Sequence, residues 1–171
     1  LENVTGGQAN DILVGDSGPN QLVGGLGNDQ LVGGAGDDVY LFSNNWGIDT
    51  MIELPGEGTD RVSFQLVTEE LTIDLDTRIV SDSSGSLLTY ANDLPEQLIS
   101  GSGNNIWIIS GVYSGSLVGG SSNDTYRFLD GAVVTGTVDG QGGSDVLDYS
   151  LYTTAVAIDL QARSSSHTAG Y

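Results

Sequence analysis

The chain begins a run of four consecutive nine-residue repeats with Gly6-Gly-Gln-Ala-Asn-Asp-Ile-Leu-Val14, followed by Gly15-Asp-Ser-Gly-Pro-Asn-Gln-Leu-Val23. The run continues as Gly24-Gly-Leu-Gly-Asn-Asp-Gln-Leu-Val32 and Gly33-Gly-Ala-Gly-Asp-Asp-Val-Tyr-Leu41. The shared pattern is G-G-x-G-x-D-x-U-x, where U is a large apolar residue. One such stretch is weak evidence for any structure, but four in unbroken register are strong evidence for a repetitive fold.

Each position of the repeat has a physical purpose. The glycines permit positive φ and close backbone approach, so the chain turns sharply. The sixth residue is Asp11, Asn20, Asp29 or Asp38, each an oxygen donor of the kind that calcium prefers. The last three residues favour a short strand, whose alternation puts Leu13, Leu22, Leu31 and Tyr40 on one interior face. Two turn–strand units then make one coil of 18 residues, and alternate repeats stack.

These repeats resemble the calcium-binding nonapeptide repeats of the RTX, or haemolysin-type, family, which form a parallel β-helix. The resemblance implies ions between one turn and the turn two repeats later, held by backbone carbonyls and by both sixth-position side chains. One implied site contains Gly7, Ala9 and Asp11 with Gly24, Leu26 and Asp29, and a second contains Asp16, Gly18 and Asn20 with Gly33, Ala35 and Asp38. The turn glycines Gly25, Gly27, Gly34 and Gly36 belong to the same two candidate sites.

Three positions depart from the family pattern. Ala9 and Asp16 replace glycines, and Asn20 replaces an aspartate, which lowers the ligand charge and predicts a weaker second site. The alternative is a set of metal-free Asx turns, in which each side chain satisfies its own backbone. Stacking without a counter-ion would crowd Asp11 against Asp29, which disfavours that alternative.

The pattern continues less regularly to residue 63. Asn44-Asn-Trp-Gly-Ile-Asp-Thr-Met-Ile52 keeps Gly47 and the sixth-position Asp49, and Pro55-Gly-Glu-Gly-Thr-Asp-Arg-Val-Ser63 keeps Gly56, Gly58 and the sixth-position Asp60. Trp46, Asp49, Glu57 and Asp60 are therefore candidate members of two further sites, below the third and fourth turns. Their repeats begin 20 and 22 residues after the turns above, so small insertions must bulge outward. Ordinary Gly-Asp turns are an equal alternative here.

The C-terminal half resembles the first half. Residues 58–78 align with residues 143–163 at an offset of 85, with 8 of 21 positions identical. We therefore predict one long unit over 1–93, made of a roll (1–63) and a β excursion (64–93), and a degenerate second unit over 94–171. Its candidate calcium residues are Gly119, Ser121, Asp124, Gly140, Gly142 and Asp145. Asn105 replaces the carboxylate in the turn before them, so most ions are expected before residue 64.

No window has helical periodicity, whereas 71–75 and 155–160 alternate as half-buried strands do. The predicted fold is all-β: a right-handed parallel β-roll or β-helix solenoid with calcium ions in its turns. Such a body is quasi-one-dimensional, because each coil depends on its neighbours.

The net charge of the chain limits the classes of molecule that it can bind. The formal net charge is −19, with 23 acidic residues against four basic ones. Nucleic acid is an unfavourable partner, because phosphate contacts require clustered Lys or Arg. No apolar run approaches the length of a membrane span, so membrane insertion is not expected. Glu53 and other acidic residues outside the turns are expected to serve solubility. There is no cysteine, and bound calcium can replace disulfides as the staple.

No enzyme site is indicated. The one histidine, His167, lies in a Ser-rich tail, and a Ser-His-Asp device there is a remote alternative. Trp46 and Trp107 are expected in the core or as caps rather than as sugar platforms. The favoured interpretation is a non-catalytic, secreted or cell-surface calcium-binding spacer of a large adhesin-like protein, with neighbouring repeats or a polysaccharide as possible partners. The alternative is a calcium-dependent folding and secretion module of an exported enzyme.

Overall fold

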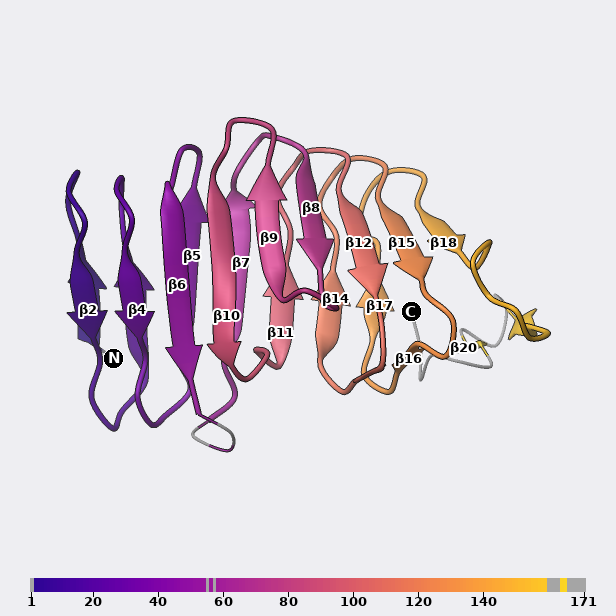
Figure 1. Ribbon diagram of the computed structural model, residues 1–171, viewed down its shortest axis with the longest axis horizontal. Helices are drawn as coiled ribbons and strands as arrows, with labels where there is room; N and C mark the ends of the chain where they lie inside the picture. Colours follow the sequence, from indigo (N-terminus) through magenta and orange to yellow (C-terminus); the bar gives the residue numbers. More distant parts are fainter. Residues whose placement is uncertain (1, 55, 57, 160–163, 166–171) are drawn as a thin grey trace.

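The computed structural model describes residues 2–54, 56, 58–159 and 164–165 of the chain. All regular elements within those residues are strands, and they lie side by side along the long axis of the molecule (Figure 1). The predicted all-β parallel solenoid is thus confirmed. The described part of the chain contains no helix with the length and apolar character of a membrane span.

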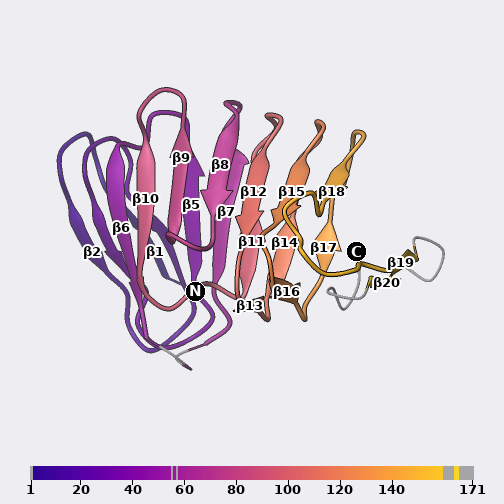
Figure 2. The same cartoon turned by 45° about the vertical axis from the view of Figure 1, so that its right-hand side comes forward.

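Two long sheets face each other (Figure 2). The seven-stranded sheet has, in spatial order, β1 (Glu2–Thr5), β3 (Asn20–Val23), β5 (Val39–Ser43), β7 (Arg61–Leu66), β11 (Gln97–Ile99), β14 (Ser116–Val118) and β17 (Val138–Asp139). The nine-stranded sheet has β18 (Val146–Asp148), β15 (Thr125–Phe128), β12 (Ile106–Ile109), β8 (Leu71–Asp74), β9 (Ile79–Asp82), β10 (Leu87–Asn92), β6 (Ile48–Glu53), β4 (Gln30–Val32) and β2 (Ile12–Val14).

The first coils have the predicted length and interior. Strand β2 pairs with β4 so that Leu13 lies opposite Leu31, and β3 pairs with β5 so that Leu22 lies opposite Tyr40. Both registers correspond to 18 residues per coil. Leu22, Leu31 and Tyr40 are fully buried between the sheets, and Leu13 on the edge strand β2 is partly buried. The eighth position of each repeat therefore builds the core, as its alternation with polar neighbours predicts.

Longer coils follow without loss of stacking. Gln30 of β4 pairs with Thr50 of β6, and Val39 of β5 pairs with Arg61 of β7. A register shift between Leu41 and Ser43 adds one further residue on the β7 side of the β5–β7 pair. The longer coils predicted from the sequence are therefore present, and parallel pairing continues through them.

The predicted β excursion is part of the nine-stranded sheet. Strand β8 lies away from β6, next to β12, and the chain returns through β9 and β10 to fill the gap. Strand β9 is antiparallel to both neighbours, whereas β10 is parallel to β6 and β8 is parallel to β12. Meanwhile β7 pairs directly with β11, so one sheet gains two strands that the other lacks.

Beyond the insertion each coil has a third side. Short strands β13 (Val112–Tyr113) and β16 (Val133–Val134) form their own parallel pair between the two large sheets. Within the described residues the chain ends in an antiparallel pair, β19 (Ile158–Asp159) and β20 (Ser164–Ser165), outside the parallel stack (Figure 2). The strand predicted at 155–160 is thus short and antiparallel, and His167 lies outside the described residues.

Aromatic side chains fill the interior of both halves. Trp46 packs against Phe42 and Phe64, with ring centroids 6.0 and 5.4 Å away, and Trp107 stacks on Tyr126 at 5.4 Å. Both tryptophans are buried, which confirms the core prediction and leaves neither ring available to a sugar.

The stretches of sequence that align at an offset of about 85 lie on different sides of the coil. Residues aligned at the offset of about 85 fall on opposite sheets: β5 and β7 lie in the seven-stranded sheet, but their counterparts β15 and β18 lie in the nine-stranded one. Each side of a two-repeat coil is built from one turn and one strand, so the same turn–strand unit can form part of either sheet.

Candidate metal centre

The turns stack in two columns at opposite edges of the solenoid. We call the first column the turns that lead into the nine-stranded sheet (6–11, 24–29 and 44–49, then 100–105, 119–124 and 140–145). The second column contains those that lead into the seven-stranded sheet (15–20, 33–38, and the turns ending at Asp60 and Glu96). Each turn meets the turn one coil later, except that the β8–β10 insertion separates 44–49 from 100–105. This is the register that the candidate ligand sets require.

Backbone carbonyls at the second and fourth positions point at the turn below. The N–H of Leu26 donates to the Gly7 carbonyl at 3.0 Å, and the N–H of Ala35 donates to the Asp16 carbonyl at 3.2 Å. A Cβ added at Gly27, whose φ is +129°, would lie 2.6 Å from the Ala9 carbonyl oxygen. Gly27 is therefore required both by its backbone conformation and by the carbonyl above it.

A buried ladder joins the sixth positions of the first column. The N–H of Asp11 donates to Oδ1 of Asp29 at 2.9 Å, and the N–H of Asp29 donates to Oδ1 of Asp49 at 2.8 Å. Each carboxylate thus holds the backbone one coil above it. The strand pairing places Leu88 beneath Asp49, so this run of carboxylates ends there.

The second column contains the same buried ladder. The N–H groups of Asn20 and Asp38 donate to Oδ1 of Asp38 and Asp60 at 2.7 and 3.0 Å. The next step is longer in sequence, because Asp60 N–H donates to Oε2 of Glu96 at 2.7 Å, 36 residues away. Glu96 occupies the sixth-position role beneath Asp60, with one more methylene to reach it.

An exposed ladder of opposite direction runs beside the buried one. Here the fifth-position side chain of an upper turn accepts from the backbone of the turn below. Asn10 Oδ1 accepts from Asn28 N–H at 3.0 Å, Asn28 Oδ1 from Ile48 N–H at 3.1 Å, and Asp37 Oδ1 from Thr59 N–H at 2.9 Å. The two ladders together bond adjacent turns in both directions without any metal.

The buried ladder leaves negative charge in a desolvated place. Asp29 and Asp49 are both buried, and Oδ2 of each has no hydrogen-bond partner. Burial, and then the neighbouring Asp29 charge, raises the pKa of Asp49 to about 7. Burial, together with the Glu96 and Asp38 charges, raises the pKa of Asp60 to about 6. A divalent cation supplies the missing partner and the missing charge at once, since calcium takes carboxylate and carbonyl oxygens.

Glu53 is a buried member of the second column, and its expected role in solubility is wrong. Glu53 is the last residue of β6, and its side chain is 2 % exposed. The side chain accepts a hydrogen bond from the Tyr40 hydroxyl. Oxygens of Asp38, Glu53 and Asp60 all lie within 4.8 Å of one another. The alternating pattern of β6 turns Glu53 inward, a direction that the irregular spacing of this repeat conceals in the sequence.

The last two turns of the first column repeat the N-terminal arrangement. Asp124 N–H donates to Asp145 Oδ1 at 3.0 Å, and Gly142 N–H donates to the Gly120 carbonyl at 3.1 Å. Burial raises the pKa of Asp124, which is fully buried, whereas Asp145 is exposed. This pair of turns has the donor set of the 6–11 and 24–29 pair, with a more open lower half.

Most of the candidate residues contact the neighbouring turn, whereas others contact only their own turn or lie elsewhere. Contacts between stacked turns join the predicted upper and lower halves at Gly7, Ala9, Asp11, Asp16, Gly18 and Asn20 with Gly25, Leu26, Gly27, Asp29, Gly34, Ala35, Gly36 and Asp38, and at Asp49, Asp60, Asp124, Gly142 and Asp145. Gly24, Gly33, Gly119 and Gly140 lie against the carboxylate of their own turn, where a Cβ would collide with it. Ser121 lies above Gly142, the Trp46 ring is in the core, and Glu57 is outside the described residues.

Sequence reasoning missed two groups of residues. Glu53 and Glu96 lie outside the nonapeptide pattern, and only the spatial register reveals them. The exposed ladder was detectable, because Asn or Asp stands at the fifth position in Asn10, Asn28 and Asp37. That recurrence is a signal equal in kind to the sixth-position aspartates.

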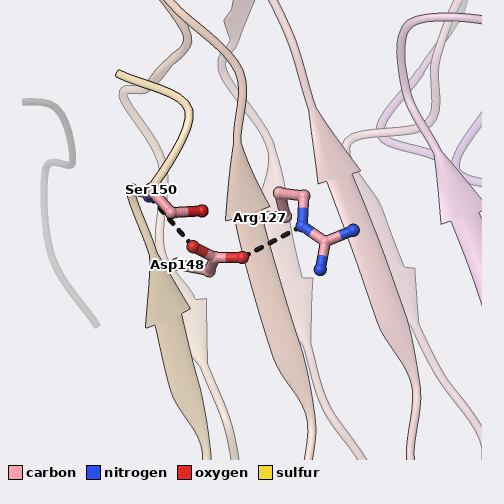
Figure 3. A network of polar contacts seen from close by, with 3 residues as sticks. All are labelled: Arg127, Asp148 and Ser150. Carbon is pink, nitrogen blue, oxygen red and sulfur yellow. Dashed lines mark hydrogen bonds and ion pairs between the residues drawn. The ribbon is translucent and has the colours of Figure 1, made fainter. Parts of the chain in front are cut away.

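In the described part of the chain, an ion pair lies outside the turns. Arg127 on β15 and Asp148 on β18 are register partners, and Nε lies 3.0 Å from Oδ2 (Figure 3). Hydrogen bonds from Ser150, and then Arg127, lower the pKa of Asp148 to about 2. Since both side chains are partly exposed, the pair contributes at most about 1 kcal/mol.

Residues 5–40 match the RTX calcium-binding nonapeptide repeat, in four copies. No match was found among curated proteins or among solved structures. Repeats of this family bind calcium ions in their turns, which is the chemistry that the stacked oxygens of the first column favour.

We predict that the calcium-free protein becomes more stable as pH falls from 7.5 to 5. The folded-state pKa values of Asp49 and Asp60, about 7 and about 6, exceed the ordinary value of 3.8, so the folded state binds more protons in this range. Urea unfolding in calcium-free buffer measures the effect. Asp49→Asn should flatten the dependence, and a calcium-free protein that is equally or more stable at pH 7.5 would contradict the prediction.

A second prediction concerns which carboxylate of the buried ladder contributes more to calcium affinity. Asp29 lies between Asp11 and Asp49, whereas Asp49 lies above Leu88, so Asp29 can serve two ions and Asp49 one. Asp29→Asn should therefore weaken calcium binding more than Asp49→Asn in calorimetric titration. Glu70→Gln removes one exposed carboxylate outside the ladders and is the matched control. Equal losses in the two ladder variants would show that the ions do not follow the stacking register.

Proposed function

We propose that this chain, whose residues 5–40 are RTX calcium-binding repeats, is an extracellular spacer that calcium makes rigid. The four repeats by themselves support a calcium-binding structural module. The observation that carries the proposal is the buried ladder, in which Asp29 and Asp49 stack with an unpartnered oxygen on each. A bound cation would neutralise those buried oxygens. The same carboxylates hold adjacent coils together through their Oδ1 atoms.

The shape of the solenoid supports a spacer. Strands stack along one axis (Figure 1), and each coil is bonded mainly to the coils before and after it. In such a body stability is a sum of coil and interface terms, so each cation bound between two coils stiffens the interface at which it lies. The β8–β10 insertion and the third side at β13 and β16 widen the cross-section of the solenoid.

The calcium requirement supports action outside the cell. Calcium sites of extracellular modules have dissociation constants of roughly 0.1–1 mM. At a few millimolar calcium each site then stabilises the fold by about 1–2 kcal/mol, because ligand binding adds RT ln(1 + [L]/Kd). At the far lower calcium of a cytosol the same sites contribute nothing, and the crowded carboxylates oppose folding. The chain is thus suited to export before it folds.

A secretion and folding module of an exported enzyme would use the same chemistry. The uninterrupted block of four repeats at 6–41 is the feature that favours this second candidate. The interrupted coils after residue 41 favour the spacer, since a simple folding device needs no inserted strands. Further long units in the flanking sequence would support the spacer, and an adjoining catalytic domain would support the enzyme module.

We predict that folding is linked to calcium. In millimolar calcium the protein should give the circular dichroism of a β-solenoid and a cooperative thermal transition. With excess chelator the transition should move to lower temperature and part of the β signal should be lost, because Asp11, Asp29 and Asp49 then repel. Magnesium at equal concentration is the control, since it requires a tighter octahedral site and keeps its waters.

Small-angle scattering on the same samples measures the spacer property. Calcium should give an elongated particle of fixed length, and chelator a broader distribution of sizes. Identical melting temperatures and identical scattering in calcium and in chelator would contradict both the calcium linkage and the rigid spacer.

A further inference from the structure

The turn at 100–105 has an amide where the other buried turns of its column have a carboxylate. Asn105 is 1 % exposed, and its Nδ2 lies among four oxygens. These are Oγ of Ser100 at 3.1 Å, the carbonyls of Gly101 and Gly103 at 3.1 and 2.8 Å, and Oδ1 of Asp124 at 2.9 Å. An amide nitrogen with two hydrogens thus lies at the centre of a nest of acceptors.

Three of these oxygens are the ones that an ion would use. Gly101 and Gly103 hold the second and fourth positions of their turn, as Gly7 and Ala9 do in the first turn. Asp124 holds the sixth position one coil later, as Asp29 does. The turns at 100–105 and 119–124 therefore present the oxygens of a metal site, and the Asn105 amide faces them from inside.

The orientation of the amide is fixed by its surroundings. Oδ1 of Asn105 accepts a hydrogen bond from Leu71 N–H at 3.1 Å. Exchanging the amide oxygen and nitrogen would set N–H against N–H at Leu71 and would set the oxygen against the Gly101, Gly103 and Asp124 oxygens. The hydrogen-bond network therefore determines which atom faces the nest.

An asparagine at this position does not by itself produce the arrangement. Asn20 also replaces a sixth-position aspartate, but its Oδ1 accepts from Asp16 N–H at 2.7 Å. The contact of its Nδ2 is a long one, 3.4 Å to Oδ1 of Asp16. Asn20 thus turns its oxygen toward its own turn, whereas Asn105 turns its nitrogen toward the carbonyls.

We propose that the Asn105 amide replaces a calcium ion, so that the coil joining 100–105 to 119–124 closes without metal. The amide hydrogens satisfy the carbonyls of Gly101 and Gly103 and oppose the charge of Asp124, which also accepts from Asn105 N–H at 2.8 Å and Gly120 N–H at 2.9 Å. The stacked Trp107 and Tyr126 rings follow directly on β12 and β15. This part of the solenoid stays folded at calcium concentrations that loosen the N-terminal coils.

The inference rests on the proposed function only where it contrasts this coil with the calcium-binding N-terminal turns. The variant Asn105→Asp tests the amide replacement separately from that function. The aspartate restores a carboxylate opposite Asp124 and removes the two amide hydrogens. Titration calorimetry should then show one more calcium ion per chain than in the unchanged protein. In chelator the variant should melt at lower temperature than the unchanged protein.

The matched control is Asn104→Asp. It adds the same charge one residue earlier, at an exposed fifth position, and keeps an oxygen to accept from Asn123 N–H, as Asn104 Oδ1 does at 3.1 Å. Its calcium stoichiometry should equal that of the unchanged protein. An extra ion in this control would overturn the proposal, because charge alone would then explain the gain.

Hydrogen exchange on the unchanged protein gives an independent readout. In chelator the amides of Asn105 and Thr125, which donate to Asp124 Oδ1 and to the Asn105 carbonyl, should stay protected. Loss of their protection together with that of Asp11 and Asp29 would overturn the proposal, as would Asn105→Asp gaining no ion or failing to fold in calcium. An unchanged protein that binds no calcium would refute the proposed function, while an ion gained by Asn105→Asp would still support the amide replacement.

Discussion

A buried carboxylate has two oxygens, and in the first turn column the backbone satisfies one of them at Asp29 and at Asp49. Oδ1 of each accepts from the N–H one coil above, which sets the coil spacing and the register of the strands that follow. Oδ2 of each is buried without a partner. Because the charge of such a group is costly to desolvate, the same contact that builds the solenoid also creates its need for a cation. Stability and calcium binding are therefore two consequences of one arrangement.

The fold changes where this arrangement stops. Leu88 lies beneath Asp49, and Leu71 lies above Asn105, so the ladder of sixth-position side chains is interrupted at both ends of the β8–β10 insertion. There the nine-stranded sheet is held by antiparallel pairing and by apolar packing instead. The column resumes at Asn105 with an amide and at Asp124 with a carboxylate. Sixth positions joined by the ladder are 18 to 22 residues apart. The coil length can vary in this way because the ladder fixes only the position of the turn.

The nonapeptide block was predictable because each of its constraints is local. Glycine at the turn, Asp11 or Asp29 at the sixth position and Leu22 or Leu31 at the eighth follow from short-range geometry. Glu96 was not predictable, since the β8–β10 insertion lengthens its coil and places it 36 residues after Asp60. Glu53 was missed because an irregular repeat hides which way β6 faces. The contrast between Asn20 and Asn105 depends on which amide atom meets a neighbouring turn, and the sequence shows only the same residue type at both positions.

The most direct measurement is anomalous scattering from calcium in crystals grown with the ion. The account predicts ions in the first column between 6–11 and 24–29 and between 24–29 and 44–49, with Asp29 contacting both. It predicts further ions in the second column beside Asp38 and Asp60, and none between 100–105 and 119–124. Ions found mainly beyond residue 95, or an ion that displaces the Asn105 amide from Gly101 and Gly103, would contradict it.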